Sequence, residues 1–196
     1  MGLLKLSKPS RSQKTWKVYF VKFILLFVGY LTARKGVYDL IKAFKRIKDA
    51  DVALVVGGAG RVEKRLKRLT DGAANIFFPG YIDGDLKSEY YQIADVFVLP
   101  SYIDPWPVVV LEAMMYNLPV ITTTGAGCTA DLIGEGNILT IKPGDVGALQ
   151  KAMERLIRED KTRTQMGKKS AAARKKFSIE NRKKIFVDAI EYCLSK

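Results

Sequence analysis

Short, wholly apolar runs alternate along this chain with longer segments in which apolar residues recur at helical spacing. Runs that are apolar on both faces are typical of strands buried inside a parallel sheet. We expect such strands at residues 24–29, 52–57, 75–80, 95–100, 119–123 and 137–141. Because parallel strands need right-handed helical crossovers, the alternation predicts an α/β fold. Its core would be a Rossmann-like, doubly wound parallel sheet of about six strands with helices on both faces.

The segments between these strands have the pattern of helices. In residues 35–48, apolar side chains recur every three or four positions and so share one helical face. Further helices are expected at residues 61–69, 86–93 and 107–116, from about residue 128, and as two basic helices in the C-terminal third that are separated near Phe177. Residues 1–22 are basic, and about the first 17 of them lack both periodicities. We therefore expect a flexible lead or linker remnant there, followed by a single domain over residues 23–196.

The chain carries 33 lysine and arginine residues against 20 aspartate and glutamate, a formal net charge of +13. Residues 1–22 contain six basic side chains and no acidic one, and residues 161–184 contain ten basic and one acidic. The rest of the chain is near neutral. We expect no nucleic acid as the partner, because the basic C-terminal stretch has only Phe177 for the stacking that single-strand binders use. Cationic ends would favour an anionic membrane surface.

Composition excludes several classes of site. The 196 residues include no histidine, so neither a Ser-His-Asp or Cys-His arrangement nor a His-ligated metal can be built from this chain. The two cysteines, Cys128 and Cys193, lack CxxC spacing, which argues against a zinc site or a disulfide framework. No apolar run approaches the roughly 20 residues of a membrane span, and no signal-peptide pattern is present. We expect a cytoplasmic protein without a metal centre.

In a doubly wound sheet, ligands bind beyond the carboxyl ends of the strands. The loop after the first predicted strand begins with Gly29 and leads to Arg34 and Lys35 at the start of a helix. Exposed backbone N–H groups and the positive end of the helix dipole suit an anion at such a place. Taken alone, however, the loop is explained more simply as a turn glycine followed by two solvated cations.

The segment after the fourth predicted strand contains two acidic residues. Asp104 followed by Pro105 has the sequence of a helix N-cap and first helical position. The helix that follows is apolar on nearly all sides, which predicts that it is buried, and Glu112 is its only charge. A buried carboxylate needs a partner, either another side chain or the hydroxyls of a ligand. The position of Glu112 near the carboxyl edge of the sheet favours the ligand.

Glycines follow two other predicted strands. Gly125 and Gly127 come after the fifth strand, where a short helix from about Cys128 would complete another anion-binding nest. With no base beside it, Cys128 is expected to pack rather than to act as a nucleophile. The glycines after the second strand lack the third glycine of a dinucleotide fingerprint, where Glu63 stands, and we interpret them as a turn.

The order of these motifs is more informative than any one of them. They are FVGYL at 27–31, KG at 35–36, LVVGGAG at 54–60, FFPGYI at 77–82, ADVFVLPS at 94–101, DPWP at 104–107, LEAM at 111–114, PVITT at 119–123, GAG at 125–127, PGD at 143–145 and FS at 177–178. In this order the chain resembles the C-terminal, donor-binding domain of family 4 retaining glycosyltransferases, which have the GT-B fold. The resemblance covers about residues 24–194, and the LPS to LEAM segment is its most specific part.

The resemblance implies a role for each candidate residue. Lys35 would neutralise the diphosphate of a nucleotide-sugar donor, Asp104 would face hydroxyls of the donor sugar, and Glu112 would bind the ribose. Backbone groups near Ile82 would meet the base. The resemblance also assigns to the donor site Gly29, Tyr30, Arg34, Trp106, Val108 and the loop of Ala126, Gly127, Cys128 and Thr129, with its backbone amides. No metal or cofactor is needed if these groups stabilise the leaving nucleotide.

Three positions depart from the family's pattern. Tyr30 stands where the family usually has arginine, Asp104 replaces a glutamate, and Pro107 replaces a glycine and removes a backbone N–H. The resemblance implies retaining hexosyl transfer to a glycan or lipid-linked glycan that a separate N-terminal domain holds. Tyr30 and Pro107 leave open a catalytically inactive binding or interaction module. The cationic ends leave open a basic protein that binds nucleic acid or a membrane surface.

Overall fold

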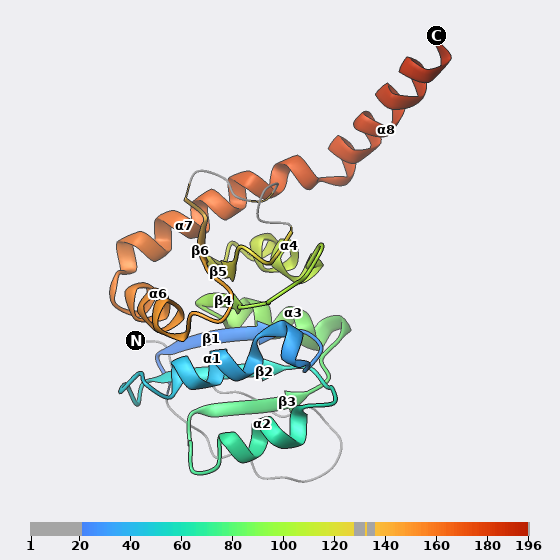
Figure 1. Ribbon diagram of the computed structural model, residues 1–196. Coiled ribbons are helices and arrows are strands. Elements are labelled where there is room, and N and C mark those ends of the chain that lie inside the picture. The colour runs from blue at the N-terminus through green and yellow to red at the C-terminus, as the bar shows by residue number, and fades with distance from the viewer. Residues whose placement is uncertain (1–20, 128–131, 133–135, 196) are drawn as a thin grey trace.

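The computed structural model describes residues 21–127, 132 and 136–195, and this part of the chain forms a parallel sheet (Figure 1). The sheet has six strands in the order β3-β2-β1-β4-β5-β6, and all pairs are parallel. The strands are β1 (Phe23–Val28), β2 (Val52–Gly57), β3 (Ile76–Gly80), β4 (Val96–Leu99), β5 (Val120–Thr123) and β6 (Ile138–Ile141). The Rossmann-like α/β fold predicted from the sequence is therefore confirmed.

Helices connect the first five strands, and others follow β6 at the C-terminal end. They are α1 (Val37–Phe44), α2 (Glu63–Leu69), α3 (Gly84–Ile93), α4 (Val108–Met115), α6 (Val146–Arg158), α7 (Asp160–Ala173) and α8 (Ile179–Leu194), with 3-10 turns η1 (Ala33–Lys35) and η2 (Arg174–Phe177). Helix α1 packs on α2 and α6, whereas α4 packs on α7. Residues 1–20 of the expected lead lie outside the described residues. The start of the helix expected from residue 128 also lies outside them.

The helix predicted at residues 35–48 is shorter at both ends. Gly36 adopts the left-handed conformation between η1 and α1, with a φ of 68°. This conformation interrupts the helix before Val37. After Phe44 the chain closes into a turn, in which the N–H of Ile47 donates to the carbonyl of Phe44. Apolar spacing continues through this turn because Ile47 still packs on the core, which explains why the pattern overestimates the helix.

The middle of the sheet forms a continuous apolar core. Strands β1, β2, β4 and β5 are buried along their whole length. Strands β3 and β6 are only partly buried, because an edge strand has a neighbour on one side only. The expectation that all six strands are buried is therefore wrong for these two.

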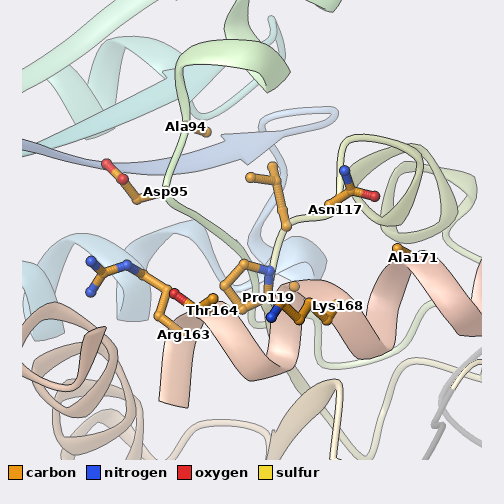
Figure 2. Close-up of a pocket in the computed structure, with 10 residues that line it drawn as sticks. Ala94, Asp95, Asn117, Pro119, Arg163, Thr164, Lys168 and Ala171 are labelled. Atoms are coloured by element: carbon orange, nitrogen blue, oxygen red, sulfur yellow. The ribbon is translucent and has the colours of Figure 1, made fainter. Parts of the chain in front are cut away.

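A cavity of about 380 Å³ lies at the amino end of the sheet, between the starts of β4 and β5 and helix α7 (Figure 2). Asp95 Oδ2 accepts a hydrogen bond of 2.7 Å from the N–H of Ile24, and burial raises the pKa of Asp95. Arg163 donates to the carbonyl of Leu156 at 2.8 Å and lies over the Phe23 ring, 4.9 Å from its centroid. The Asp95 and Arg163 side chains that line this cavity therefore have a structural role, because their contacts hold β1, β4 and α7 together.

Helix α8 extends away from the sheet, and its C-terminal end is the part farthest from the body in Figure 1. Residues 183–195 are all exposed, including the apolar side chains of Phe186, Ile190 and Leu194. Within the described residues, no helix is long and apolar enough to cross a membrane.

Gly36 brings the loop after β1 against the end of β4. Its φ is +68°, and a Cβ built there would lie 1.9 Å from the carbonyl oxygen of Pro100. The left-handed conformation alone costs an L-residue roughly 1–2 kcal/mol. Only glycine permits this approach of the two backbones, and η1 is thereby fixed beside the carboxyl end of β4.

We expect Gly36→Ala to lower the free energy of unfolding by about 3 kcal/mol or more, because conformational strain and the clash with Pro100 add. Gly72→Ala is the matched control: its φ is +77° and no atom of the described residues lies within 4 Å of the added Cβ, so about 1 kcal/mol is expected. Urea denaturation followed by circular dichroism measures both. Equal losses would contradict a role for the Gly36 and Pro100 contact.

Candidate functional site

Three loops meet at the carboxyl edge of the sheet, beyond β1, β4 and β5. Backbone hydrogen bonds join them. The N–H of Tyr102 donates to the carbonyl of Arg34 at 2.8 Å, and the N–H of Asp104 donates to that of Gly125 at 2.9 Å. The N–H of Gly127 donates back to Asp104 at 2.8 Å. The loop after β4 is therefore held on both sides by the loops of neighbouring strands.

The side chain of Asp104 reaches the turn after β1. Lys35 Nζ donates to Asp104 Oδ2, and the two side chains are only 12% and 9% exposed. A carboxylate this deeply buried requires such a partner. The interpretation of Asp104 as a helix cap is wrong, because α4 begins at Val108 with Pro107 as its N-cap. Asp104 instead forms an isolated parallel bridge with Ala126, which keeps its backbone extended.

The other predicted residues of the first loop differ in exposure. The N–H of Gly29 donates to the carbonyl of Gly57 at 3.0 Å, which continues the pairing of β1 and β2. Tyr30 is 73% exposed. Arg34 is also exposed, and its Nη1 donates to the carbonyl of Ile103 at 3.0 Å. Arg34, which follows β1, thus brings a positive charge to the loop after β4, next to Asp104.

Glu112 lies on α4, and its carboxylate contacts two side chains of α3. Lys87 Nζ is 2.7 Å from Oε1 and 2.6 Å from Oε2. The hydroxyl of Tyr91 donates to Oε2 at 2.9 Å. The sequence left open whether Glu112 pairs with another side chain or with a ligand. The structure shows that side chains contact it. Sequence reasoning missed Lys87 and Tyr91: their spacing of four places both on one face of a helix, but it does not tell which helix this face meets.

Helix α4 is less buried than its sequence predicts. Its inward side chains, Val110, Leu111, Ala113 and Met114, are buried. Val108 and Met115, however, are 54% and 55% exposed, and the Glu112 side chain is 32% exposed. The prediction of a helix buried on all sides is therefore wrong. The helix covers the sheet with one face, and α7 and η2 pack on only part of the remainder.

Tyr91 is the most buried residue of this cluster, with 1% of its surface exposed. Its ring stacks on that of Tyr116, with centroids 5.3 Å apart, and lies 5.8 Å from that of Phe97. Burial, together with the negative charge of Glu112, raises the pKa of Tyr91 well above its ordinary value of 10.0. The hydroxyl therefore stays protonated and remains a donor to Glu112.

The remaining predicted residues surround this edge. Ile82 follows β3 and is buried, with 4% of its surface exposed. Trp106 is 42% exposed, and its ring centroid lies 6.4 Å from that of Phe177. The predicted backbone donors after β5 are described only in part: Ala126 is buried, Gly127 is exposed, and Cys128 and Thr129 lie outside the described residues.

The edge combines carboxylates with ammonium groups and backbone N–H groups. Lys35 neutralises Asp104 and Lys87 neutralises Glu112, while Arg34 adds a further charge. Such a set can bind a ligand that carries both anionic oxygens and hydroxyls, since ammonium groups donate to the former and carboxylates accept from the latter. In the described part of the chain, no group of three or more histidine, cysteine, aspartate or glutamate side chains could hold a metal ion.

The protein-family model described as "Glycosyl transferases group 1" matches residues 12–173. Among curated proteins, the chain is 31% identical over 138 residues to the uncharacterized glycosyltransferase MJ1607 of Methanocaldococcus jannaschii, covering 68% of this chain and 35% of that protein. It is 33% identical over 132 residues to the putative teichuronic acid biosynthesis glycosyltransferase TuaC of Bacillus subtilis, covering 67% of this chain and 32% of that one. The chain thus spans about a third of the length of these relatives.

Two solved structures show the same fold. One is the C-terminal domain of a glycosyl transferase group 1 family protein (LpcC) from Francisella tularensis, with a TM-score of 0.75 and 23% identity over 81% of this chain and 88% of that one. The other is sucrose-phosphate synthase from Thermosynechococcus elongatus, with a TM-score of 0.77 and 27% identity over 88% and 46% of the two chains. The resemblance to a GT-B C-terminal domain is confirmed, while its assignment to family 4 stays a prediction.

The raised pKa of Tyr91 predicts a pH dependence of stability. The unfolded chain releases the Tyr91 proton near pH 10.0 and the folded chain does not, so the stability from this group is present below pH 10.0 and is lost as pH rises above it. Urea denaturation between about pH 8 and about pH 11 should therefore show a steeper alkaline loss for wild type than for Tyr91→Phe. If the stability of wild type and of Tyr91→Phe falls equally with pH, the raised pKa of Tyr91 is contradicted.

Proposed function

The chain belongs to the glycosyl transferases group 1 family, and we propose that it is a donor-binding domain that takes a nucleoside-diphosphate sugar for retaining hexosyl transfer. The observation that carries the proposal is the position of Lys35 and Asp104. They follow β1 and β4, the neighbouring strands at which the strand order changes direction. In doubly wound sheets, ligands bind in the crevice beyond this switch point.

The chemistry of a nucleotide sugar suits the residues at this edge. An ammonium group has three N–H donors, so Lys35 can bind a diphosphate oxygen while it keeps a contact with Asp104. Asp104 would accept hydrogen bonds from the sugar and Glu112 from the ribose. Lys35, Arg34 and the backbone N–H groups after β5 would stabilise the negative charge that develops on the leaving nucleotide, which lowers the barrier to transfer.

Two buried hydroxyl oxygens at the same edge support a polar ligand. Thr32 Oγ1 lies in the loop after β1 and Ser101 Oγ follows β4, and neither has a hydrogen-bond partner in the part of the chain that the structure describes. Buried polar atoms are rarely left unpaired, and unpaired ones mark places that bound water or a ligand completes.

We further propose that a second domain holds the acceptor, a glycan or lipid-linked glycan. The curated relatives are about three times as long as the segment that this chain matches, which leaves room in them for such a domain. Helix α8 offers a surface for such a domain, because it exposes the apolar side chains of Phe186, Ile190 and Leu194, which proteins usually cover. On this proposal the chain alone binds a donor but transfers no sugar.

A cytoplasmic location at an anionic membrane surface completes the proposal. Helix α7 and η2 carry the exposed lysines Lys168, Lys169 and Lys176. Near an anionic surface, each lysine contributes about 1 kcal/mol of attraction, which would bring the domain close to a lipid-linked acceptor.

A catalytically inactive binding module is the second candidate. Tyr30, which stands where the family usually has arginine, is 73% exposed, and Pro107 caps α4 without an N–H to offer a phosphate. Such a domain would bind the nucleotide sugar through the same residues without transferring it, even when the acceptor domain is supplied.

Donor binding is tested by isothermal titration with UDP-glucose, GDP-mannose and ADP-glucose, of which at least one should bind. Glu112→Ala should weaken that binding about tenfold or more, because charge-assisted hydrogen bonds to the ribose are lost. Glu89→Ala removes an exposed carboxylate of α3 and should leave the affinity unchanged. The proposal fails if none of the three donors binds, and the role of Glu112 fails if its variant binds as wild type does.

Membrane binding is tested by flotation with vesicles that contain phosphatidylglycerol. Replacement of Lys168, Lys169 and Lys176 by alanine should lower the partition coefficient about 100-fold, the equivalent of about 3 kcal/mol. Replacement of the three exposed basic residues Lys64, Arg65 and Arg68 of α2 removes the same charge from another surface and should have little effect. Wild-type protein that stays entirely at the bottom of the gradient would reject membrane binding.

A further inference from the structure

Two side chains of α3 hold the carboxylate of Glu112 from one side. Lys87 Nζ lies 2.7 Å from Oε1 and 2.6 Å from Oε2, and the Tyr91 hydroxyl lies 2.9 Å from Oε2. Side chains of α3 therefore contact both oxygens of the carboxylate. The motifs that identify the family assign no role to Lys87 or Tyr91.

These contacts fix the orientation of the Glu112 side chain, and the Lys87 ammonium group balances its negative charge. A glutamate side chain loses rotamer freedom when it binds a ligand, and contacts that order it beforehand reduce this cost. A carboxylate has about four acceptor sites, so the three contacts leave capacity for a hydroxyl donor. The ammonium group of Lys87 also neutralises a charge that would otherwise repel a diphosphate nearby.

We infer that Lys87 and Tyr91 are positioning residues for the ribose: they hold Glu112 in the orientation in which it accepts hydrogen bonds from the ribose hydroxyls. The inference rests on the proposed function and adds to it a means of selecting ribonucleotides. Helix α3 begins at Gly84, two residues after Ile82. The segment that would meet the base therefore leads directly into the helix that orients the ribose-binding carboxylate.

Lys87 is the better probe of the two. The side chains of Lys87 and Glu112 are 26% and 32% exposed, and ion pairs this close to solvent contribute little to the stability of a fold. Tyr91 is buried and stacked on Tyr116, so its replacement also disturbs the core. An effect of Lys87 on nucleotide affinity can therefore be separated from an effect on folding.

The experiment is isothermal titration with UDP and with 2′,3′-dideoxy-UDP, which lacks both ribose hydroxyls, or with the GDP or ADP pair if wild type prefers another base. Lys87→Met should weaken UDP binding about tenfold but dideoxy-UDP binding less than about twofold, because the second ligand makes no contact that Glu112 orientation controls. Lys87→Arg should restore UDP affinity to within about threefold of wild type, since arginine also contacts both carboxylate oxygens. Lys42→Met, at an exposed lysine of α1, is the matched control and should change neither affinity.

Three results would overturn the inference, and each is distinct from failure of donor binding. Equal weakening of both nucleotides by Lys87→Met would place Lys87 at the diphosphate or in the fold. Unchanged affinities would show that Glu112 needs no positioning by Lys87. Equal wild-type affinity for UDP and dideoxy-UDP would show that the ribose hydroxyls are not read, although the donor site exists. Absence of binding of UDP, GDP and ADP to wild type would defeat the proposed function, and this inference with it.

Discussion

The pairing of β1 with β4 is the constraint on which the candidate site depends. These two neighbours belong to opposite halves of the sheet, and the loops that follow them meet where the strand order changes direction. Gly36 lets the backbone after β1 approach the backbone of Pro100, where a Cβ would clash. Lys35 directly precedes Gly36, and Asp104 follows Pro100 by four residues. The approach of the two backbones therefore places Lys35 and Asp104 against each other. A side chain at position 36 would separate the pair without altering either charged residue.

The central strands could be predicted from the sequence because burial on both faces leaves a short, continuous apolar run, which is typical of a strand inside a parallel sheet. The same rule failed where burial is one-sided. Strands β3 and β6 are apolar but lie at the edges, and α4 is apolar at Val108 and Met115 although both are more than half exposed. Apolar composition reports what a segment can bury, whereas the position of its neighbours decides what it does bury. The same limit applies to Asp104, whose cap-like sequence is overruled by a bridge to a distant loop.

The polar contacts at this edge were beyond the reach of local pattern. Lys35 and Asp104 are 69 residues apart, and their proximity could be expected only from the resemblance and from the rule that loops after parallel strands share one edge. Lys87 contacts Glu112 across 25 residues, and neither the resemblance nor the rule points to it. Helical spacing shows which residues share a face, but the pairing of two faces is set by the packing of whole helices on the sheet. Chemistry that depends on helix-to-helix contacts therefore needs the structure.

The Lys35–Asp104 and Lys87–Glu112 ion pairs differ in solvent exposure. Under the proposed function, this difference gives each pair a different role in donor binding. Lys35 and Asp104 are 12% and 9% exposed, so a diphosphate and a sugar can reach them only by taking over part of a nearly buried ion pair. Loss of a contact in such a pair is costly, and the donor must replace it with contacts of equal strength. Lys87 and Glu112 are 26% and 32% exposed, and Glu112 can accept a ribose hydroxyl while its lysine stays in place. Recognition of the nucleoside would then use the existing contacts of Glu112 with α3, whereas the diphosphate and the sugar would bind to the nearly buried pair beside the bond to be broken.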